Sequence, residues 1–265
     1  PHGRCCIKTH PLVDHTGKVA LITGGPRGIG LQMAEALGEH GASLALSARK
    51  QHELDEAQAH FDKLGIPCFT VRNDLSDFPS IPGLAEAIIS HYGKVDILVN
   101  NAGCSWGAPA EDMTDEAWHK VMDLDISAQF FLSREIGKRS MIANGGGKII
   151  NIASIAGLGG NPPGWGMDTV GYNTAKGAMV NFTKALAAEW GKYNIQVNAI
   201  CPGFFLTKIS AGLLDKIEQK YIDLNPAGRL GNEDDLKGIA VLLASKASDY
   251  ITGQAIAVDG GCTAV

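Results

Sequence analysis

Residues 19–30 read Val-Ala-Leu-Ile-Thr-Gly-Gly-Pro-Arg-Gly-Ile-Gly, and the organisation of the chain can be read outward from them. The four apolar residues 19–22 are typical of a strand that is buried on both faces of a parallel sheet. Apolar residues recur at helical spacing after the glycines, at Ile29, Met33, Ala34 and Leu37. The stretch therefore predicts a strand, a glycine-rich turn and the N-terminus of a helix.

A turn of this kind is suited to a phosphate group. Helix N-termini offer unpaired N–H groups and the positive end of the helix dipole. Gly24, Gly28 and Gly30 carry no side chain that would hold a pyrophosphate away from the backbone. Their spacing is one residue longer than that of the common dinucleotide fingerprint. Taken alone, the motif also fits a tight strand-to-helix turn that binds nothing.

Composition limits the possible partners. The chain has 265 residues, of which 45% are hydrophobic and 19% charged, so it can bury a large core in one large or two small domains. Its net charge of -5 argues against nucleic acid and anionic membrane surfaces. No apolar run approaches the ~20 residues of a membrane-spanning helix, and no signal peptide opens the chain. We expect a soluble, cytoplasmic protein.

The cysteines and the first residues of the chain predict no metal site. The six cysteines contain no CxxC pair, which fits a reducing compartment. The N-terminal histidines and cysteines lack the ligand spacing of structural metal sites; they are His2, Cys5, Cys6, His10 and His15. We expect residues 1–16 to be an irregular, disordered extension and residues 17–265 to form one domain.

Strand-like and helix-like segments alternate along the chain. Strands are expected at 19–22, 43–48, 68–71, 95–99, 148–153, 195–200 and 255–258. Helices are expected from the glycine turn to 38 and at 51–64, 81–91, 115–142, 172–190 and 234–244, with a helical excursion before 225. This alternation predicts right-handed βαβ units and a parallel sheet.

The end of the second strand bears on the choice of cofactor. In a dinucleotide fold the residue about 20 positions beyond the glycine turn meets the adenosine ribose, and an acidic residue there holds the 2′-hydroxyl of NAD. Ala48 takes that place here, with Arg49 beside it, and Arg27 adds a guanidinium from the turn. Two arginines without a carboxylate favour the 2′-phosphate of NADP. The alternative is a pair of solvated surface arginines.

Four residues could carry chemistry. Asp125 lies in the apolar register of the segment 115–142, so its carboxylate must be paired or functional. Tyr172 and Lys176 stand one helical turn apart on the same face. A nearby ammonium favours the phenolate form of a tyrosine, so this pair could exchange a proton with a substrate. Ser154, at the end of the fifth strand, could polarise a substrate oxygen.

Five motifs in register resemble the short-chain dehydrogenases/reductases. They are Thr-Gly-x-x-x-Gly-Ile-Gly at 23–30, Asn-Asn-Ala-Gly at 100–103, Ser154, Tyr172-x-x-x-Lys176 and Pro202-Gly203. The resemblance covers the chain from Gly17 to Gly261. It implies an α/β fold with a single Rossmann-like domain, a seven-stranded parallel sheet and helices on both faces. It also implies a homotetramer and hydride transfer between a nicotinamide and a carbonyl or alcohol.

The resemblance assigns roles to individual positions. It implies that Tyr172 is the general acid/base, that Ser154 orients the carbonyl group, and that Lys176 stabilises the tyrosine and holds the nicotinamide ribose. The residues that it implies for NADP(H) binding, besides Tyr172 and Lys176, are Gly24, Arg27, Gly28, Ile29, Gly30, Arg49, Asp74, Leu75, Asn101, Ala102, Gly103, Pro202, Gly203 and Thr207.

The chain departs from the family pattern in two places. Asp125 stands where the family usually has an asparagine that holds a proton-relay water, and its charge would stabilise Lys176 as an ammonium. The gluconate 5-dehydrogenase-like branch has the same aspartate, and this chain also resembles that branch at 123–125, 148–151 and 235–238. Ser154 and Tyr172 are 18 positions apart, several more than usual, with the extra residues at 162–168 beside the substrate mouth.

We therefore expect an NADPH-dependent enzyme that reversibly reduces a ketone to a secondary alcohol. The expected substrate contacts are Ser154, Trp106, Trp165 and Phe205. The branch resemblance favours a keto-sugar acid or polyol, whereas the aromatic residues favour a small apolar or aromatic ketone. The alternatives are reduction of a 3-oxoacyl thioester and a catalytically silent protein that binds the nucleotide as a sensor or scaffold.

Overall fold

The computed structural model describes residues 10–205 and 211–265 and contains a seven-stranded parallel sheet. Its strands are β1 (Val19–Thr23), β2 (Ser43–Ala48), β3 (Cys68–Arg72), β4 (Ile97–Asn100), β5 (Gly147–Ile152), β6 (Ile195–Pro202) and β7 (Ala255–Val258). They lie in the order β3-β2-β1-β4-β5-β6-β7. The strand order reverses where β1 meets β4, and open parallel sheets bind ligands at such a point.

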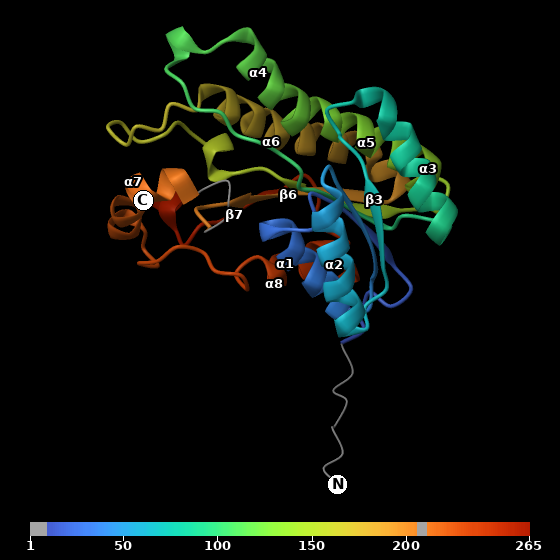
Figure 1. Cartoon of the computed structure of the whole chain (residues 1–265). Helices are drawn as coiled ribbons and strands as arrows, with labels where there is room; N and C mark the ends of the chain where they lie inside the picture. The colour runs from blue at the N-terminus through green and yellow to red at the C-terminus, as the bar shows by residue number, and fades with distance from the viewer. Residues whose placement is uncertain (1–9, 206–210) are drawn as a thin grey trace.

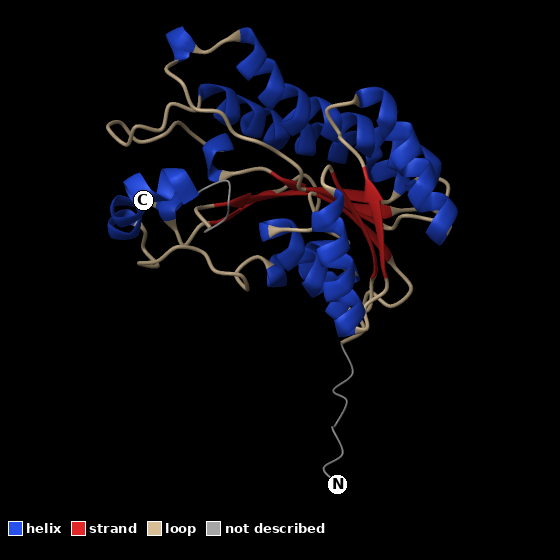
Figure 2. Ribbon diagram, in the orientation of Figure 1, coloured by secondary structure: helices blue, strands red, loops and turns tan. Residues whose placement is uncertain are grey.

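Helices cover both faces of the sheet, as predicted (Figures 1 and 2). One face carries α1 (Gly28–Glu39), α2 (Gln51–Leu64) and α8 (Lys237–Ala244). The other carries α3 (Ile81–Tyr92), α5 (Ala128–Ile136) and α6 (Val170–Trp190). The helix α4 (Asp115–Met122) extends this second layer beyond the sheet, and α7 (Ala211–Leu224) lies beside the C-terminus.

Alternating side chains on the strands produce two cores. Ile22 and Val99 pack under α1, α2 and α8, whereas Leu21 and Leu98 pack under α3, α5 and α6. Both sets are fully buried, because a parallel sheet in this fold is covered on each face. The uninterrupted apolar runs that predicted the strands follow from this double burial.

The predicted helix over 115–142 is confirmed as a continuous helical stretch from 115 to 141, but it is not α-helical throughout. It consists of α4 and α5 joined by a π-helical turn, Asp123–Ser127, and it ends in a second π-helical turn, Gly137–Met141. Apolar spacing does not distinguish an α-helix from one that contains an extra residue in a turn. Turns of this type are frequent at functional sites, and the first one contains Asp125.

The chain before β1 is packed against the domain where the structure describes it. His15 is buried, and its backbone N–H donates to the carbonyl oxygen of His40 at 2.8 Å. The carbonyl oxygen of Leu12 accepts from the N–H of Ala247 at 3.2 Å. The expectation of a disordered segment is therefore wrong for residues 12 and 15. Within residues 10–205 and 211–265, no helix combines the length and the apolar character needed to cross a membrane.

Candidate active site

The glycine turn closes at the carboxyl end of β1. Gly24 has a φ of +62°, and a Cβ on Gly30 would lie against the Gly24 carbonyl oxygen and 2.6 Å from Asn101 Nδ2. The side chain of Asn101 donates to the carbonyl oxygens of Thr23 and Gly24 at 2.9 and 3.2 Å. The turn that precedes α1 is thus held in place by the segment after β4, at a helix N-terminus of the kind that binds a pyrophosphate.

Buried amides join the strands beneath this turn. Asn100 Nδ2 donates to Ser133 Oγ at 2.9 Å and to Asn151 Oδ1 at 2.8 Å. Asn151 Nδ2 in turn donates to Thr183 Oγ1 at 2.9 Å. This network was not predicted from the sequence. The signal that could have indicated it is the presence of polar residues inside two otherwise apolar strands. It fixes α5 and α6 to β4 and β5, and therefore fixes the lysine carried by α6.

Asp125 and Lys176 form an ion pair in the interior. Asp125 Oδ2 lies 3.1 Å from Lys176 Nζ, and the two side chains are 0% and 6% exposed. The other carboxylate oxygen accepts from the N–H of Cys104 at 2.7 Å, which ties the turn after β4 to the same group. Lys176 Nζ also donates to the carbonyl oxygen of Ile152, at the end of β5, at 3.0 Å.

The electrostatics of this pair favour a charged lysine. Burial raises the pKa of Asp125, against the opposing effect of the Lys176 ammonium. Burial by itself lowers the pKa of Lys176, but Asp125 and Tyr172 more than offset it, so that this pKa lies above its ordinary value. The Cys104 N–H at one carboxylate oxygen and the Lys176 ammonium at the other both favour the charged form of Asp125 and so oppose the effect of burial on its pKa.

Tyr172 and Ser154 lie close to the lysine in the fold. Lys176 Nζ is 5.4 Å from the centre of the Tyr172 ring. Ser154 follows β5, and its Oγ accepts from the N–H of Ala156 at 3.1 Å, which leaves the hydroxyl proton to be donated elsewhere. The short turn Ile155–Gly157 packs directly on α6, since a Cβ on Gly157 would lie 2.5 Å from the Lys176 carbonyl group.

The region at the end of β2, where the adenosine ribose is expected to bind, contains a carboxylate that was not predicted from the sequence. Arg27 Nη1 lies 2.9 Å from Glu53 Oε1, and Lys50 Nζ lies 3.4 Å from the same oxygen. The Glu53 side chain is 9% exposed, whereas that of Arg27 is 44% exposed. The expectation of two arginines without a carboxylate is therefore wrong. The sequence did not indicate this contact, because Glu53 lies in the first turn of α2 and not at the end of β2, where an acidic residue is expected.

Arg49 and Asp74 line one open cavity of about 390 Å³ beside β2 and β3, together with Arg72, Asn73, Asp77 and Ser80. Arg72 Nε donates to the carbonyl oxygen of Arg49 at 3.1 Å, so a second guanidinium lies beside the predicted one. Leu75 is instead 4% exposed and packs in the core under α3, so only its backbone could meet an adenine.

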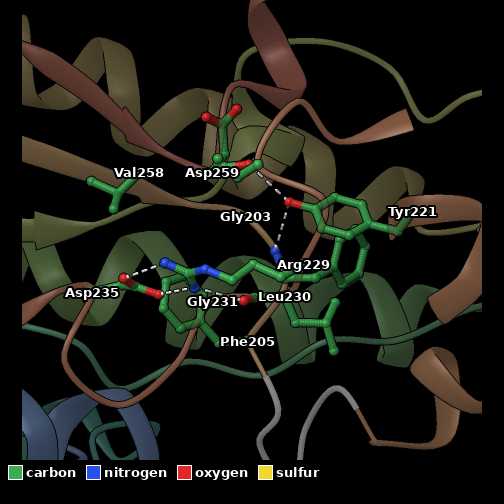
Figure 3. Close-up of a pocket in the computed structure, with 12 residues that line it drawn as sticks. Gly203, Phe205, Tyr221, Arg229, Leu230, Gly231, Asp235, Val258 and Asp259 are labelled. Atoms are coloured by element: carbon green, nitrogen blue, oxygen red, sulfur yellow. Dashed lines mark hydrogen bonds and ion pairs between the residues drawn. The ribbon is translucent and has the colours of Figure 1, made fainter. Parts of the chain in front are cut away.

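A second cavity, of about 150 Å³, lies at the end of β6 and β7 (Figure 3). Its lining includes Gly203 and Phe205, and Tyr221 from α7 closes one side. Figure 3 shows the Tyr221 hydroxyl pointing to the Asp259 carbonyl oxygen, to which it donates at 3.1 Å. Arg229 pairs with Asp235, Nη2 to Oδ1, at 2.9 Å at the rim. Thr207, a predicted cofactor contact, lies outside the described residues.

The two predicted tryptophan contacts lie on separate segments. Trp106 is 43% exposed and lies under Lys120, whose Nζ is 4.9 Å from the centre of the ring. Trp165 is half-buried in the loop between Ser154 and α6. That loop is tied to the Trp106 segment, because the N–H of Ala108 donates to the Asp168 carbonyl oxygen at 2.8 Å. Over residues 10–205 and 211–265, no cluster of three potential metal ligands occurs.

Comparison with known sequences supports the reading of the motifs. The family described as Enoyl-(Acyl carrier protein) reductase matches residues 24–263. Gluconate 5-dehydrogenase of Gluconobacter oxydans is 36% identical over 260 residues, which cover 96% of this chain and 98% of that protein. The 2-dehydro-3-deoxy-D-gluconate 5-dehydrogenase of Dickeya dadantii is 41% identical over 247 residues, 92% of this chain and 95% of that protein.

Solved structures agree with the fold. The crystal structure of a gluconate 5-dehydrogenase from Burkholderia cenocepacia, in complex with NADP and tartrate, superposes with a TM-score of 0.90 at 34% sequence identity. The similarity covers 96% of this chain and 98% of that one. Sequence and structure therefore match over more than nine-tenths of each chain.

Proposed function

The chain belongs to the short-chain dehydrogenase/reductase family, and we propose that it uses NADPH to reduce a ketone reversibly to a secondary alcohol. The observation that carries the proposal is the buried ion pair between Lys176 and Asp125, with the Tyr172 ring 5.4 Å from the ammonium. Burying a charged pair is costly, so its position beneath a predicted proton donor favours catalysis over a purely structural role.

The residues present suit a dinucleotide with a 2′-phosphate. Gly24 and Gly30 allow the tight packing of the turn against Asn101, which sets the N-terminus of α1 where a pyrophosphate would bind. Arg27 and Arg49 are the cations for the 2′-phosphate, and exposure of the Arg27 side chain leaves part of its guanidinium accessible. The relative from Burkholderia cenocepacia was solved with NADP.

The proton comes from this chain. NADPH would supply the hydride and with it both electrons of the new C–H bond, while the Tyr172 hydroxyl would donate its proton to the carbonyl oxygen. Ser154 donates a hydrogen bond to the same oxygen, where negative charge develops. The Lys176 ammonium stabilises the phenolate that remains, and Asp125 keeps the ammonium in place. The reverse sequence oxidises the alcohol.

We propose a keto-sugar acid as the substrate. The support is that the two curated relatives are named as a gluconate and a 2-dehydro-3-deoxy-D-gluconate 5-dehydrogenase. A 3-oxoacyl thioester is the second candidate, favoured by the similarity to the 3-oxoacyl-[acyl-carrier-protein] reductase of Chlamydia muridarum, which is 35% identical over 245 residues. Trp106, Trp165 and Phe205 are the proposed walls of the substrate site.

The test is the initial rate of NADPH oxidation with 5-ketogluconate, a diketone, an aryl ketone and an acetoacetyl thioester. We expect the keto acid to turn over fastest and Tyr172→Phe to lose activity by about 100-fold or more while still binding NADPH. Fastest turnover of the thioester would transfer the assignment to the second candidate. Unchanged turnover in Tyr172→Phe would exclude the mechanism.

We also propose a homotetramer. The support is one exposed aromatic side chain on the α5–α6 layer: Phe130 is 41% exposed, and its ring lies 6.1 Å from that of the half-buried Phe182 on α6. Residues 17–265 are proposed as the catalytic domain, with residues 1–16 as an N-terminal extension. A cytoplasmic location fits the four cysteines of the described residues, which are all free.

A further inference from the structure

The loop between Ser154 and α6 is closed at its base by three side chains. Figure 1 shows this segment projecting beyond the sheet, between α4 and α7. Its length comes from the residues that separate Ser154 and Tyr172 by 18 positions. The closing residues are Asn161 and Thr169 in the loop and Asn173 on α6, here called the loop clamp.

Each residue of the loop clamp both donates and accepts a hydrogen bond. Asn161 Nδ2 donates to Thr169 Oγ1 at 2.9 Å, and Thr169 Oγ1 donates to Asn173 Oδ1 at 2.8 Å. Asn173 Nδ2 donates back to Asn161 Oδ1 at 3.2 Å, which closes a ring. Asn161 Nδ2 also donates to the carbonyl oxygen of Met167 at 2.7 Å, inside the loop. Hydrogen bonds arranged in a ring polarise one another and hold a single geometry.

The loop clamp takes the place of an ordinary helix cap. Thr169 immediately precedes α6, where a threonine hydroxyl normally accepts from an N–H of the first turn. No side-chain cap is made here; the hydroxyl instead bonds the side chain of Asn173, four residues further on. Asn173 is the residue after Tyr172. The first turn of the helix that carries Tyr172 is therefore fixed by the loop.

The loop is also tied to both sides of the predicted substrate mouth. The Asp168 carbonyl oxygen accepts from the N–H of Ala108, on the segment after β4. The Gly164 carbonyl oxygen accepts from Lys220 Nζ of α7 at 3.5 Å. A displacement at the base of the loop would thus be transmitted to the start of α6 and to the walls around it.

We propose that Asn161 and Thr169 are positioning residues, which hold the Tyr172 hydroxyl in the geometry needed for proton transfer. This inference rests on the proposed function, in which Tyr172 is the proton donor. Neither side chain is assigned a contact with substrate or cofactor. A shift of about 1 Å in a reacting group can lower the rate on the order of 100-fold. Loosening the first turn of α6 should therefore lower kcat.

The test compares two substitutions at one position. Thr169→Val keeps the shape and removes the hydroxyl, whereas Thr169→Ser keeps the hydroxyl. Thr174→Val is the matched control, because among residues 10–205 and 211–265 the Thr174 hydroxyl bonds only the Val170 carbonyl oxygen, at 2.7 Å, within the same helix. We expect kcat for the best ketone to fall by about tenfold to 100-fold in Thr169→Val and by less than about threefold in the other two. Asn161→Ala should resemble Thr169→Val.

Two further readouts separate positioning from general damage. Binding of adenosine 2′,5′-bisphosphate, measured by calorimetry, should stay within about twofold of wild type in every variant, because the nucleotide turn is not disturbed. Hydrogen exchange at the amides of residues 172–175 should become faster in Thr169→Val and Asn161→Ala only.

The outcomes decide the inference separately from the proposed function. Equal kcat in Thr169→Val and Thr169→Ser, or an equal loss in Thr174→Val, would overturn it. If the wild type reduces no ketone, the proposed function is wrong. The hydrogen-exchange measurement then tests by itself whether the loop clamp stabilises the first turn of α6. Unchanged exchange at 172–175 would then reject the clamp as well.

Discussion

Lys176 Nζ lies 3.1 Å from Asp125 Oδ2, with both side chains in the interior of the protein. The carboxylate belongs to a π-helical turn and the ammonium to the second turn of α6, so the pair joins two elements that are distant in sequence. Since Asp125 also accepts from the backbone of Cys104, one carboxylate holds the turn after β4 and the lysine in a fixed relation.

Removing this carboxylate should affect stability and pH dependence differently in two variants. Asp125→Leu leaves a buried ammonium without its partner and should lower the free energy of unfolding by about 3–5 kcal/mol. Asp125→Asn keeps an acceptor for the Cys104 N–H and should lose less. Because Asp125 raises the pKa of Lys176, the alkaline limb of the pH–rate profile of Asp125→Asn should move to lower pH. Urea unfolding and the pH–rate profile measure the two effects. An alkaline limb at the wild-type pH would contradict the coupling.

The arginines of the adenosine end should set the preference for NADPH. Arg27→Ala and Arg49→Ala should each raise KM for NADPH by about tenfold or more and leave KM for NADH nearly unchanged, because a charged hydrogen bond to the 2′-phosphate is lost. Arg139→Ala is the control, since Arg139 pairs with Glu86 and Glu135 on the exposed surface. Equal changes for both cofactors would show that the arginines support the turn only.

Replacing Glu53 should change KM for NADPH in a direction that the charges predict. Glu53→Gln keeps an oxygen that can accept from Arg27 and removes a negative charge close to the proposed 2′-phosphate. KM for NADPH should fall by about twofold to fivefold at low ionic strength, and the gain should shrink as salt is added. Glu56→Gln, an exposed change on the same helix, is the control. A rise of KM in Glu53→Gln would mean that the ion pair matters chiefly for holding Arg27.

His15 should make the protein less stable in mild acid. Burial, with a smaller contribution from the nearby His40, lowers the pKa of His15 from 6.5 to about 4. A histidine whose pKa is depressed by folding contributes stability above its unfolded pKa and loses it as the pH falls through the folded value. Between pH 6.5 and about 4 the free energy of unfolding should drop by up to about 3 kcal/mol from this group.

Urea unfolding at several pH values measures this loss. His15→Leu should flatten the acid dependence, whereas His119→Leu, at an exposed position on α4, should leave it unchanged. The same slope in His15→Leu and wild type would assign the acid sensitivity to other groups.

The exposed face of the α5–α6 layer should be an interface between chains. Phe130→Ser removes an exposed aromatic side chain that packs beside Arg134, whose guanidinium carbon lies 5.7 Å from the centre of the ring. Light scattering should give the mass of four chains for the wild type and a smaller mass for the variant. Leu64→Ser, at an exposed position of α2 that is 49% accessible, is the control. A wild-type monomer would reject the tetramer.

The sequence by itself determined the order of the strands and helices and the family. The continuous apolar run 19–22 falls within β1, whose residues are all buried, because a strand covered on both faces carries no polar alternation. The glycine turn could also be predicted from the sequence. The positive φ of Gly24 and the close backbone contacts of Gly30 leave no room for residues that carry a Cβ. Ser154, Tyr172 and Lys176 remain predictions as catalytic residues, although the structure brings Lys176 and Tyr172 together.

Only the tertiary structure decided which groups meet. Glu53 reaches Arg27 from another helix, and Asp125 reaches Lys176 through a π-helical turn that apolar spacing does not reveal. The loop clamp likewise depends on how 158–169 folds back on α6. The spacing of apolar residues along a helix or strand predicts which of its sides is buried. Ion pairs and hydrogen bonds depend on distances of a few ångströms between distant residues, and packing sets those distances.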